Sequence, residues 1–241
     1  MTALGDQTGS PPSQDPSFDP VLHPVLGVDS HLPVVPKERL EIPYIRRLFS
    51  GGIRVDSEIF GDYSRLDKQA TINNAVKASV LFAIVDKPNP SLLFTVRSAK
   101  LRKHSGQISF AGGRLDDSDP SETYTALREA QEEIGLDPSS VEVLGQMSKY
   151  LTGTGYIVTP VVALVEPNMQ LLLNPHEVTE TFEVPLEFLM NPSNHRRHTR
   201  EFQGKTREWF SMPFNQDGRD RFIWGATAGM IRNFYHFLMH E

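Results

Sequence analysis

The segment "ALREAQEEIGL" (Ala126–Leu136) decides how this chain is interpreted, because it combines a helical apolar pattern with dense acidity. Within five residues it carries three glutamates and, next to them, an arginine: Arg128, Glu129, Glu132 and Glu133. Such an acidic run is either an ordinary solvated helix face or a binding site for a positively charged ligand. The neighbouring sequence has to decide between the two.

The apolar positions around these acids have helical spacing. One stripe, at i, i+3 and i+7, is formed by Leu127, Ala130 and Ile134. This spacing predicts a helix over residues 121–136 that buries the stripe. Ser121 or Thr123 is a suitable N-terminal cap, and Gly135 is placed to end the helix.

The acidity is more concentrated than a solvated face requires. Like charges at i, i+3 and i+4 repel by only about 0.2–0.5 kcal/mol per pair, so repulsion alone does not exclude a solvated face. The glutamates, however, lie toward the helix C-terminus, where the macrodipole disfavours negative charge. A second acidic loop precedes them, with Asp116, Asp117 and Asp119. Clustered carboxylates without His or Cys are oxygen ligands suited to Mg²⁺, Mn²⁺ or Ca²⁺.

The composition of the chain excludes several functional classes. With 241 residues, 39% of them hydrophobic, the chain is typical of a globular protein. The net charge of −6 gives no general attraction to nucleic acid or anionic lipid, so neither is an expected partner. The absence of cysteine excludes disulfides, thiolate zinc sites and Cys nucleophiles. It also suits a reducing compartment, and we expect a cytoplasmic protein.

The first 36 residues differ in composition from the rest of the chain. They hold seven of the eighteen prolines and no Lys or Arg, so they lack the basic residues of a signal or transit peptide. We expect a disordered tail over 1–36, with "VLHPVLGV" as a docking patch, and one domain over 37–241. The longest apolar run, Ala78–Val85, is far shorter than the roughly 18 residues of a membrane span.

The remaining segments predict strands around this helix. Val76–Asp86 and Ser91–Ser98 flank a Pro-Asn-Pro turn and predict a hairpin. Further strands are expected in 141–151, 156–166 and 180–189, and a helix in 224–241. Residues 37–52 suggest a short helical lead-in broken by Pro43, and the basic cluster 194–200 is interpreted as a solvated loop. The order predicts a single mixed α/β core.

The acidic helix and its approach resemble a known motif. Gly112–Leu136 is similar to the Nudix box, which is a Gly, a Glu and then R-E-x-x-E-E-x-G with an aliphatic residue. The second half matches in full with Arg128, Glu129, Glu132, Glu133, Gly135 and Leu136. The first half departs from the motif, because Asp119 stands where the box has Glu and Arg128 comes one residue later.

The flanking sequence resembles one branch of that family. Leu92–Asp119 carries an R-S pair, an L-R-x-H-x-G-Q run and a turn before the box that are typical of coenzyme A diphosphatases. Ala111 stands where this branch usually has proline. With later segments, the resemblance spans roughly residues 75 to 235. It implies a Nudix fold, in which a mixed sheet is sandwiched between helices.

The resemblance also implies a reaction. Nudix hydrolases cleave a nucleoside diphosphate linked to another group, and this branch cleaves coenzyme A or acyl-CoA to 3′,5′-ADP and (acyl-)4′-phosphopantetheine. The implied cofactor is Mg²⁺ or Mn²⁺, which neutralises the diphosphate and orients the attacking water. The expected partner is a small nucleotide, and a homodimer is left open.

Roles for individual residues follow from the resemblance. The implied metal ligands are Glu129, Glu133, Glu132 and the carbonyl of Gly112 or Gly113. Glu132 is alternatively the water activator, Glu177 is the general-base candidate from a later loop with Glu180 behind it, and Arg128 braces the carboxylates. The implied substrate contacts are Arg97, Ser98, Arg102 and Gln107, while His104 is expected to orient the turn.

Two other functions compete with this hypothesis. The substrate is alternatively another diphosphate, such as NADH, ADP-ribose or an oxidised nucleotide. A Nudix-fold binding domain without catalysis is the second alternative, but such domains usually lose box glutamates, and all three are present here.

Overall fold

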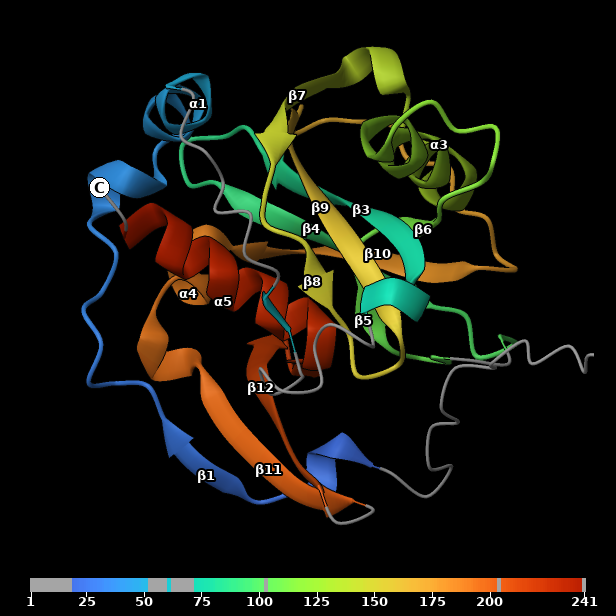
Figure 1. The fold of residues 1–241 in the computed structure, drawn as a ribbon. Coiled ribbons are helices and arrows are strands. Elements are labelled where there is room, and N and C mark those ends of the chain that lie inside the picture. Colours follow the sequence, from blue (N-terminus) through green and yellow to red (C-terminus); the bar gives the residue numbers. More distant parts are fainter. Residues whose placement is uncertain (1–18, 52–59, 62–71, 102–103, 203–204, 240–241) are drawn as a thin grey trace, which may run out of the picture.

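The computed structural model describes residues 19–51, 60–61, 72–101, 104–202 and 205–239 (Figure 1). Its α-helices are α1 (Ile42–Ser50), α3 (Glu122–Ile134), α4 (Leu186–Leu189) and α5 (Gly225–Met239). Its shorter 3₁₀ helices are Pro20–Leu22, Lys37–Leu40, Pro138–Ser140 and Pro192–Asn194. Across the described segments, none of the helices is long and apolar enough to cross a membrane.

Most strands belong to a mixed sheet with β3 at its centre. Its strands are β2 (Phe60–Gly61), β3 (Val76–Val85), β4 (Ser91–Arg97), β5 (Ile108–Ser109), β6 (Gly112–Arg114), β7 (Val141–Gln146), β8 (Tyr150–Leu151), β9 (Tyr156–Val165) and β10 (Val178–Pro185). The main path is β10-β4-β3-β9-β8-β2. β3 pairs parallel with β9 and antiparallel with β4, which confirms the predicted hairpin.

Helices cover both faces of this sheet, because β3 is apolar on both sides. Leu81 and Ala83 pack in the core beneath α3, whereas Phe82 and Ile84 belong to the core that α5 closes. This alternation follows from the two-residue period of a strand. Figure 1 shows α3 on one side of β3 and β9 and α5 on the other. The predicted mixed α/β fold, a sheet between helices, is therefore confirmed.

The ends of α3 match the predicted signals. The side chain of Ser121 accepts a hydrogen bond from the Tyr124 amide and caps the first turn. Gly135 adopts φ 68°, the left-handed conformation that closes a helix with little cost only for glycine. A side chain there would also meet the backbone of Leu172 at 2.8 Å. The cap and the glycine thus fix how far the acidic helix extends.

A second, antiparallel sheet lies on the α5 side of the molecule. It has the order β1 (Val25–Val28), β11 (Arg196–Phe202), β12 (Lys205–Gln216) and β13 (Arg219–Trp224). The interpretation of 194–200 as a solvated loop is wrong, because His195 and His198 are buried there. His198 stacks on Trp209 and is held by Ser211, which explains how a basic segment enters a core.

The prediction of a disordered tail is wrong for residues 19–36, while residues 1–18 lie outside the described part of the chain. β1 pairs with β11, so the predicted docking patch docks on the chain's own second sheet. The buried carboxylate of Asp29 pairs with Arg232 of α5 at 2.9 Å and with Arg197 at 3.0 Å. Tyr235 also donates a hydrogen bond to the carbonyl of Pro33. These contacts hold residues 19–36 in place, although the composition of the segment is typical of a disordered tail.

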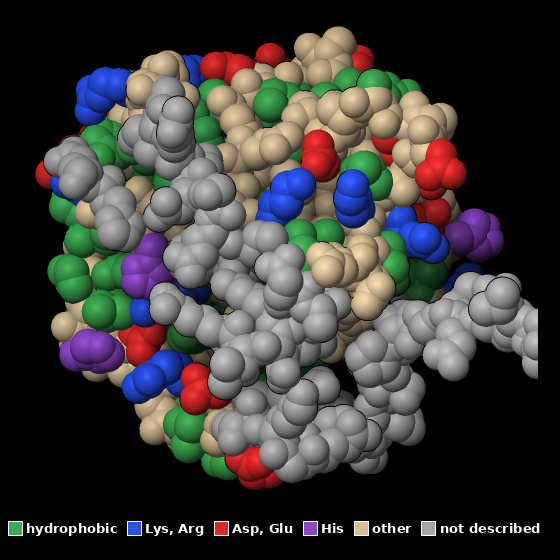
Figure 2. Space-filling view, in the orientation of Figure 1, with side chains coloured by type: hydrophobic (Ala, Val, Ile, Leu, Met, Phe, Trp, Pro, Cys, Tyr) green, Lys and Arg blue, Asp and Glu red, His purple; other side chains and the backbone are tan. Residues whose placement is uncertain are grey.

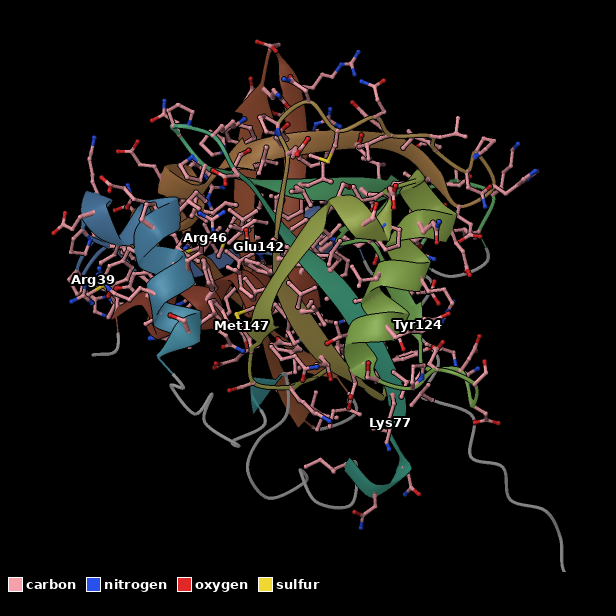
Figure 3. All side chains as sticks on the ribbon, turned by 90° about the horizontal axis from the view of Figure 1, so that it is seen from above. Arg39, Arg46, Lys77, Tyr124, Glu142 and Met147 are labelled. Carbon is pink, nitrogen blue, oxygen red and sulfur yellow. The ribbon has the colours of Figure 1, made fainter. Side chains whose placement is uncertain are left out.

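The lead-in helix α1 begins at Ile42, one residue before Pro43, and is not broken by that proline. Pro43 occupies the first turn, where its missing N–H is not needed. Figure 3 shows Arg46 of α1 beside Glu142 of β7, and Nη2 of Arg46 lies 2.8 Å from that carboxylate. This ion pair connects α1 to the edge of the sheet.

On the face shown in Figure 2, acidic and basic side chains are interspersed.

Candidate functional site

The three box glutamates of α3 differ sharply in exposure. The side chain of Glu133 is 2% exposed, that of Glu129 15% and that of Glu132 54%. Positions i and i+4 therefore point into the protein, and i+3 points toward solvent. A buried carboxylate is costly unless charges or hydrogen bonds compensate it, so its partners indicate what the site holds.

Glu133 has two partners that come from the strand side of the site. Its Oε1 lies 3.3 Å from Nη1 of Arg97, at the end of β4, and its Oε2 accepts a 3.2 Å hydrogen bond from the Gly112 amide. Burial raises the pKa of Glu133 to about 7, and the Arg97 charge opposes that shift. The carboxylate is thus only partly compensated by the protein itself.

Glu129 lies directly against the turn that precedes the helix. A Cβ at position 113 would be 2.4 Å from its Cδ, so only glycine allows this approach. Burial raises the pKa of Glu129, although Arg128, whose Nη1 lies 2.9 Å from Oε1, opposes the shift. Glu129 and Gly113 therefore lie in direct contact.

Arg128 braces the acidic helix from its outer side. It binds Asp119 with two hydrogen bonds, Nε to Oδ1 at 3.1 Å and Nη2 to Oδ2 at 2.9 Å. It also donates to Glu132 at 3.2 Å and to the carbonyl of Arg114 at 3.2 Å. The hydrogen bonds from Arg128 hold the pKa of Asp119 well below its usual range.

Asp119 occupies the position where the box has glutamate. Its side chain is 1% exposed and also accepts hydrogen bonds from Thr125 Oγ1 at 2.8 Å and from the Asp116 amide. It therefore anchors Arg128 and the start of α3, and its oxygens are occupied by these donors. The departure from the motif changes how the helix is held and leaves the three later glutamates in place.

Glu177 approaches the buried glutamates from the loop before β10. Its Oε1 accepts a 3.2 Å hydrogen bond from the side-chain amide of Asn174. The backbone amide of Asn174 donates to the carbonyl of Glu133 at 2.9 Å. Burial is the main cause of the raised pKa values of Glu129 and Glu133, and the nearest arginine opposes it in each case. The negative charge of Glu177 adds a smaller upward shift to both pKa values. Glu177 thus faces the same site as these two carboxylates.

Glu180, the alternative behind Glu177, points elsewhere. Both of its oxygens accept hydrogen bonds from Arg221 of β13, at 2.9 and 2.6 Å, and Arg219 adds a third at 3.2 Å. The hydrogen bond from Arg221 lowers the pKa of Glu180. A carboxylate held in this way is a poor proton acceptor, which favours Glu177 as the base.

The predicted substrate contacts fall into separate environments. Arg97 reaches the site, whereas Ser98 is buried, and its amide donates to the Glu177 carbonyl at 2.7 Å. Gln107 is hydrogen-bonded to Nδ1 of His104 at 2.8 Å, within the turn that follows β4. Arg102 lies outside the described residues.

The donor set at this site fits a hard divalent cation. Glu129, Glu133 and Glu177 supply carboxylate oxygens with at most partial compensation, and Glu132 adds one at the rim. Within the described segments, however, no three His, Asp or Glu side chains come together in a group that could hold a metal ion as they stand. The guanidinium of Arg97 instead contacts Glu133, and that of Arg128 contacts Glu129.

A surface cavity of about 780 Å³ lies away from these carboxylates. It is lined at the opposite end of β4 and β10, by residues that include Ser91, Leu93, Glu183 and Phe214. The chemistry-bearing side chains are not part of its lining. This cavity is therefore separate from the buried carboxylates of α3.

Comparison with known families identifies this arrangement. The NUDIX domain family matches residues 76–211, which include the hairpin, the turn, α3 and the loop of Glu177. The chain belongs to the Nudix family. Nudix hydrolases act on phosphoanhydride bonds and generally use divalent metal ions, so this Nudix chain is an enzyme of that class.

The chain is similar to Nudix relatives over most of their length. The chain is 42% identical over 163 residues to "Uncharacterized Nudix hydrolase NudL" of Escherichia coli strain K12, covering 67% of this chain and 82% of that protein. The match to NudL of Escherichia fergusonii has the same values. Among solved structures, a C. elegans Ap4A hydrolase has a TM-score of 0.41 and 17% identity over 48% of this chain and 85% of that one. These structural scores add nothing to the assignment.

Two partners of the predicted glutamates in this Nudix chain were not predicted from sequence. Asn174 links the end of α3 to Glu177, and Arg221 arrives from the second sheet. The Asn-Pro pair before His176 is a turn signal that indicates a loop at Asn174. No local pattern indicates the role of Arg221, because its contact depends on how the two sheets meet.

Proposed function

We propose that the chain hydrolyses the diphosphate of coenzyme A or its thioesters, giving 3′,5′-ADP and (acyl-)4′-phosphopantetheine. One observation carries the substrate part of the proposal. Arg97 belongs to the segment that resembles coenzyme A diphosphatases, and its guanidinium lies 3.3 Å from a box carboxylate. Contact between this segment and a box carboxylate supports the proposed substrate.

The proposed metal ligands are Glu129, Glu133 and Glu132, with the carbonyl of Gly113 completing the set. The partly compensated charge of Glu133 and the close contact between Gly113 and Glu129 support this set. Bound Mg²⁺ or Mn²⁺ would supply neutralisation of the diphosphate and a lower pKa of water. Positioning and electrostatics dominate phosphoryl transfer, so the geometry of these carboxylates matters more than covalent chemistry.

The remaining residues position the reactants. Glu177 is proposed to accept the proton of the attacking water, with Glu132 as the alternative. Arg128 keeps α3 and its carboxylates in place through Asp119. Arg97 is suited to bind phosphate oxygens bidentately once substrate is present. Ser98, Gln107 and Arg102 complete the proposed substrate contacts.

A substrate panel tests this proposal directly. Purified protein with Mg²⁺ or Mn²⁺ is incubated with coenzyme A, acetyl-CoA, NADH, ADP-ribose and an oxidised nucleotide. We expect the two coenzyme A compounds to have the highest kcat/KM, with 3′,5′-ADP as a product. Much faster turnover of NADH or ADP-ribose would show that the proposed substrate is wrong, while hydrolysis of a diphosphate bond would still hold.

The Glu133→Gln variant tests the chemistry independently of the substrate. We expect its kcat to fall at least about a hundredfold, since lost charge stabilisation of several kcal/mol corresponds to that factor. Absence of turnover by the wild-type protein on every diphosphate would instead favour a non-catalytic binding domain. We propose the cytoplasm as the compartment, on the absence of cysteine, and a homodimer as the assembly to be checked by light scattering.

A further inference from the structure

The strand that follows the Glu177 loop contains a β-bulge next to the site. Val178 lies opposite Arg97 and Glu180 lies opposite Val96, so Thr179 is an extra residue in β10. A bulge reverses which face each later side chain points to. Regular alternation would place Val178 and Glu180 on the same face of the sheet, and the bulge separates them.

The two faces separated by the bulge belong to different cores. Val178 packs in the core beneath α3, whereas Phe182 belongs to the core on the α5 side. Glu180, two residues before Phe182, points to that second side and meets β13 there. The bulge is therefore needed for β10 to pack against α3 at one end and to contact the second sheet at the other.

Arg221 clamps the distal side of this bulge. Its guanidinium binds both oxygens of Glu180 and lies 4.3 Å from the ring centroid of Phe182. The side chain of Arg221 is only 10% exposed, so its guanidinium binds the carboxylate largely away from water. A two-pronged contact of this kind requires a defined orientation of both groups. Arg219 makes a single contact with the same carboxylate and is 72% exposed.

Glu177 lies on the other side of the bulge and has its own backbone anchor. The Ser98 amide donates to its carbonyl, and the Glu177 amide donates to the carbonyl of Asn174. Glu177 thus lies in a short segment that is held at Asn174, by the pairing of Val178 with Arg97, and at Glu180.

From this arrangement we infer that Arg221 is a positioning residue for hydrolysis, which acts through Glu180 and the Thr179 bulge to direct Glu177 at Glu129 and Glu133. The inference rests on the proposed function, in which Glu177 accepts the proton of the attacking water. A purely structural Arg221 would affect stability and every kinetic constant without regard to Glu177. The two roles differ in a double-mutant cycle.

The cycle combines Arg221→Met with Glu177→Gln. Each variant is assayed for kcat and KM with coenzyme A, or with the best diphosphate of the panel. We expect Arg221→Met to lower kcat about tenfold or more and to change KM less than twofold. In the Glu177→Gln background it should cause no further loss of kcat, because the residue it positions has already lost its function. Arg221→Lys, which keeps the charge, should recover part of the activity.

Arg219→Met is the matched control, because it removes an arginine from the same strand and the same acceptor. It should leave kcat within twofold of the wild type. Equal losses for Arg221→Met in both backgrounds would overturn the positioning role. Wild-type kcat in Glu177→Gln would remove Glu177 as base and this inference with it, while Glu133→Gln would still report separately on the hydrolase chemistry.

A milder variant covers the case in which Arg221→Met fails to fold. Glu180→Gln keeps the shape of the side chain and weakens the clamp, and its thermal midpoint is measured alongside activity. We expect a threefold to tenfold lower kcat that disappears in the Glu177→Gln background. Unchanged kcat, or an equal loss in both backgrounds, would contradict the inference.

Discussion

Arg97 and Glu133 form an ion pair of 3.3 Å although 36 residues separate them in the sequence. The pair joins the end of β4 to the most buried glutamate of α3. It brings the segment that suggests the substrate into contact with the segment that suggests the reaction.

Removing Arg97 should weaken substrate binding. We expect Arg97→Ala to raise KM for coenzyme A about tenfold or more, because hydrogen bonds between charged groups contribute about 1.5–3 kcal/mol. Steady-state kinetics measure this change. Lys100→Ala, which removes an exposed cation from the same segment, is the control and should leave KM within twofold. An unchanged KM in Arg97→Ala would exclude a phosphate contact.

Metal binding should be linked to the protonation of Glu133. Its pKa is raised to about 7 in the metal-free protein, so below that pH a proton competes with the cation. Apparent affinity for Mn²⁺ should therefore rise with pH from 6 to 8, with proton release near pH 7. Calorimetric titrations in buffers of different ionisation enthalpy measure that release. Glu133→Gln should remove it, and release that persists in this variant would assign it to another group.

The same raised pKa predicts how the metal-free protein responds to pH. Because the folded pKa lies above the unfolded value of about 4.3, the folded state binds more protons between those values. The contribution of Glu133 to stability should therefore fall as pH rises from about 4 to 7, by at most about 4 kcal/mol. Burial lowers the pKa of His195 to about 4, which acts in the opposite sense up to about pH 6.5, so only the difference between the wild type and Glu133→Gln isolates Glu133. Urea unfolding of both proteins in EDTA at pH 5, 6, 7 and 8 measures that difference, and the stability of the wild type relative to the variant should fall as pH rises. A difference that stays constant over this range would contradict the prediction.

A methyl group at position 113 should impair catalysis more than stability. The Cβ of Gly113→Ala would lie 2.4 Å from Glu129 Cδ, and the end of that side chain can shift at little cost to the fold. We expect kcat to fall about tenfold or more and the free energy of unfolding to change by less than about 1 kcal/mol. Gly218→Ala is the converse control, because its φ of 80° gives strain without a nearby contact. It should lower stability by about 1 kcal/mol and leave kcat unchanged.

Asp29 should be important for stability although it lies in the segment that resembled a tail. Asp29→Ala leaves Arg232 buried without its carboxylate, which typically costs about 3–5 kcal/mol. Arg197→Ala removes the exposed partner and should cost less than about 1 kcal/mol. Urea unfolding of both variants measures the difference. Equal, small losses would show that the Asp29–Arg232 pair contributes little.

The acidic helix was predictable because its determinants are local. The Ser121 cap, the Gly135 end and the buried Ala130 and Ile134 all follow from spacing within one segment. The direction of Glu133 was less clear, since the stripe through Leu127 placed all three glutamates on one neighbouring face. Close packing of the turn before α3 against the helix, together with Arg97, buries Glu133 and leaves Glu132 outside.

The second sheet was not predictable from local pattern. Its strand β11 carries charged and polar residues, and burial of His198 depends on Trp209 and Ser211 in a different strand. Likewise, β1 lies in a segment with the prolines and low charge of a tail, and its pairing with β11 and the Asp29–Arg232 contact order that segment. These are long-range interactions, which a composition argument cannot contain.

The attachment of residues 19–36 also determines when this part of the molecule can fold. The carbonyl of Pro33 accepts its hydrogen bond from Tyr235, 202 residues later, and β1 has its partner in β11. Contacts of such sequence separation form late, because loop-closure entropy has to be overcome first. During synthesis, β1 therefore remains unpaired until β11 is made, and the Pro33 contact forms only after α5. An unpaired strand is a template for wrong pairing, so this interval is the period of greatest risk of misassembly.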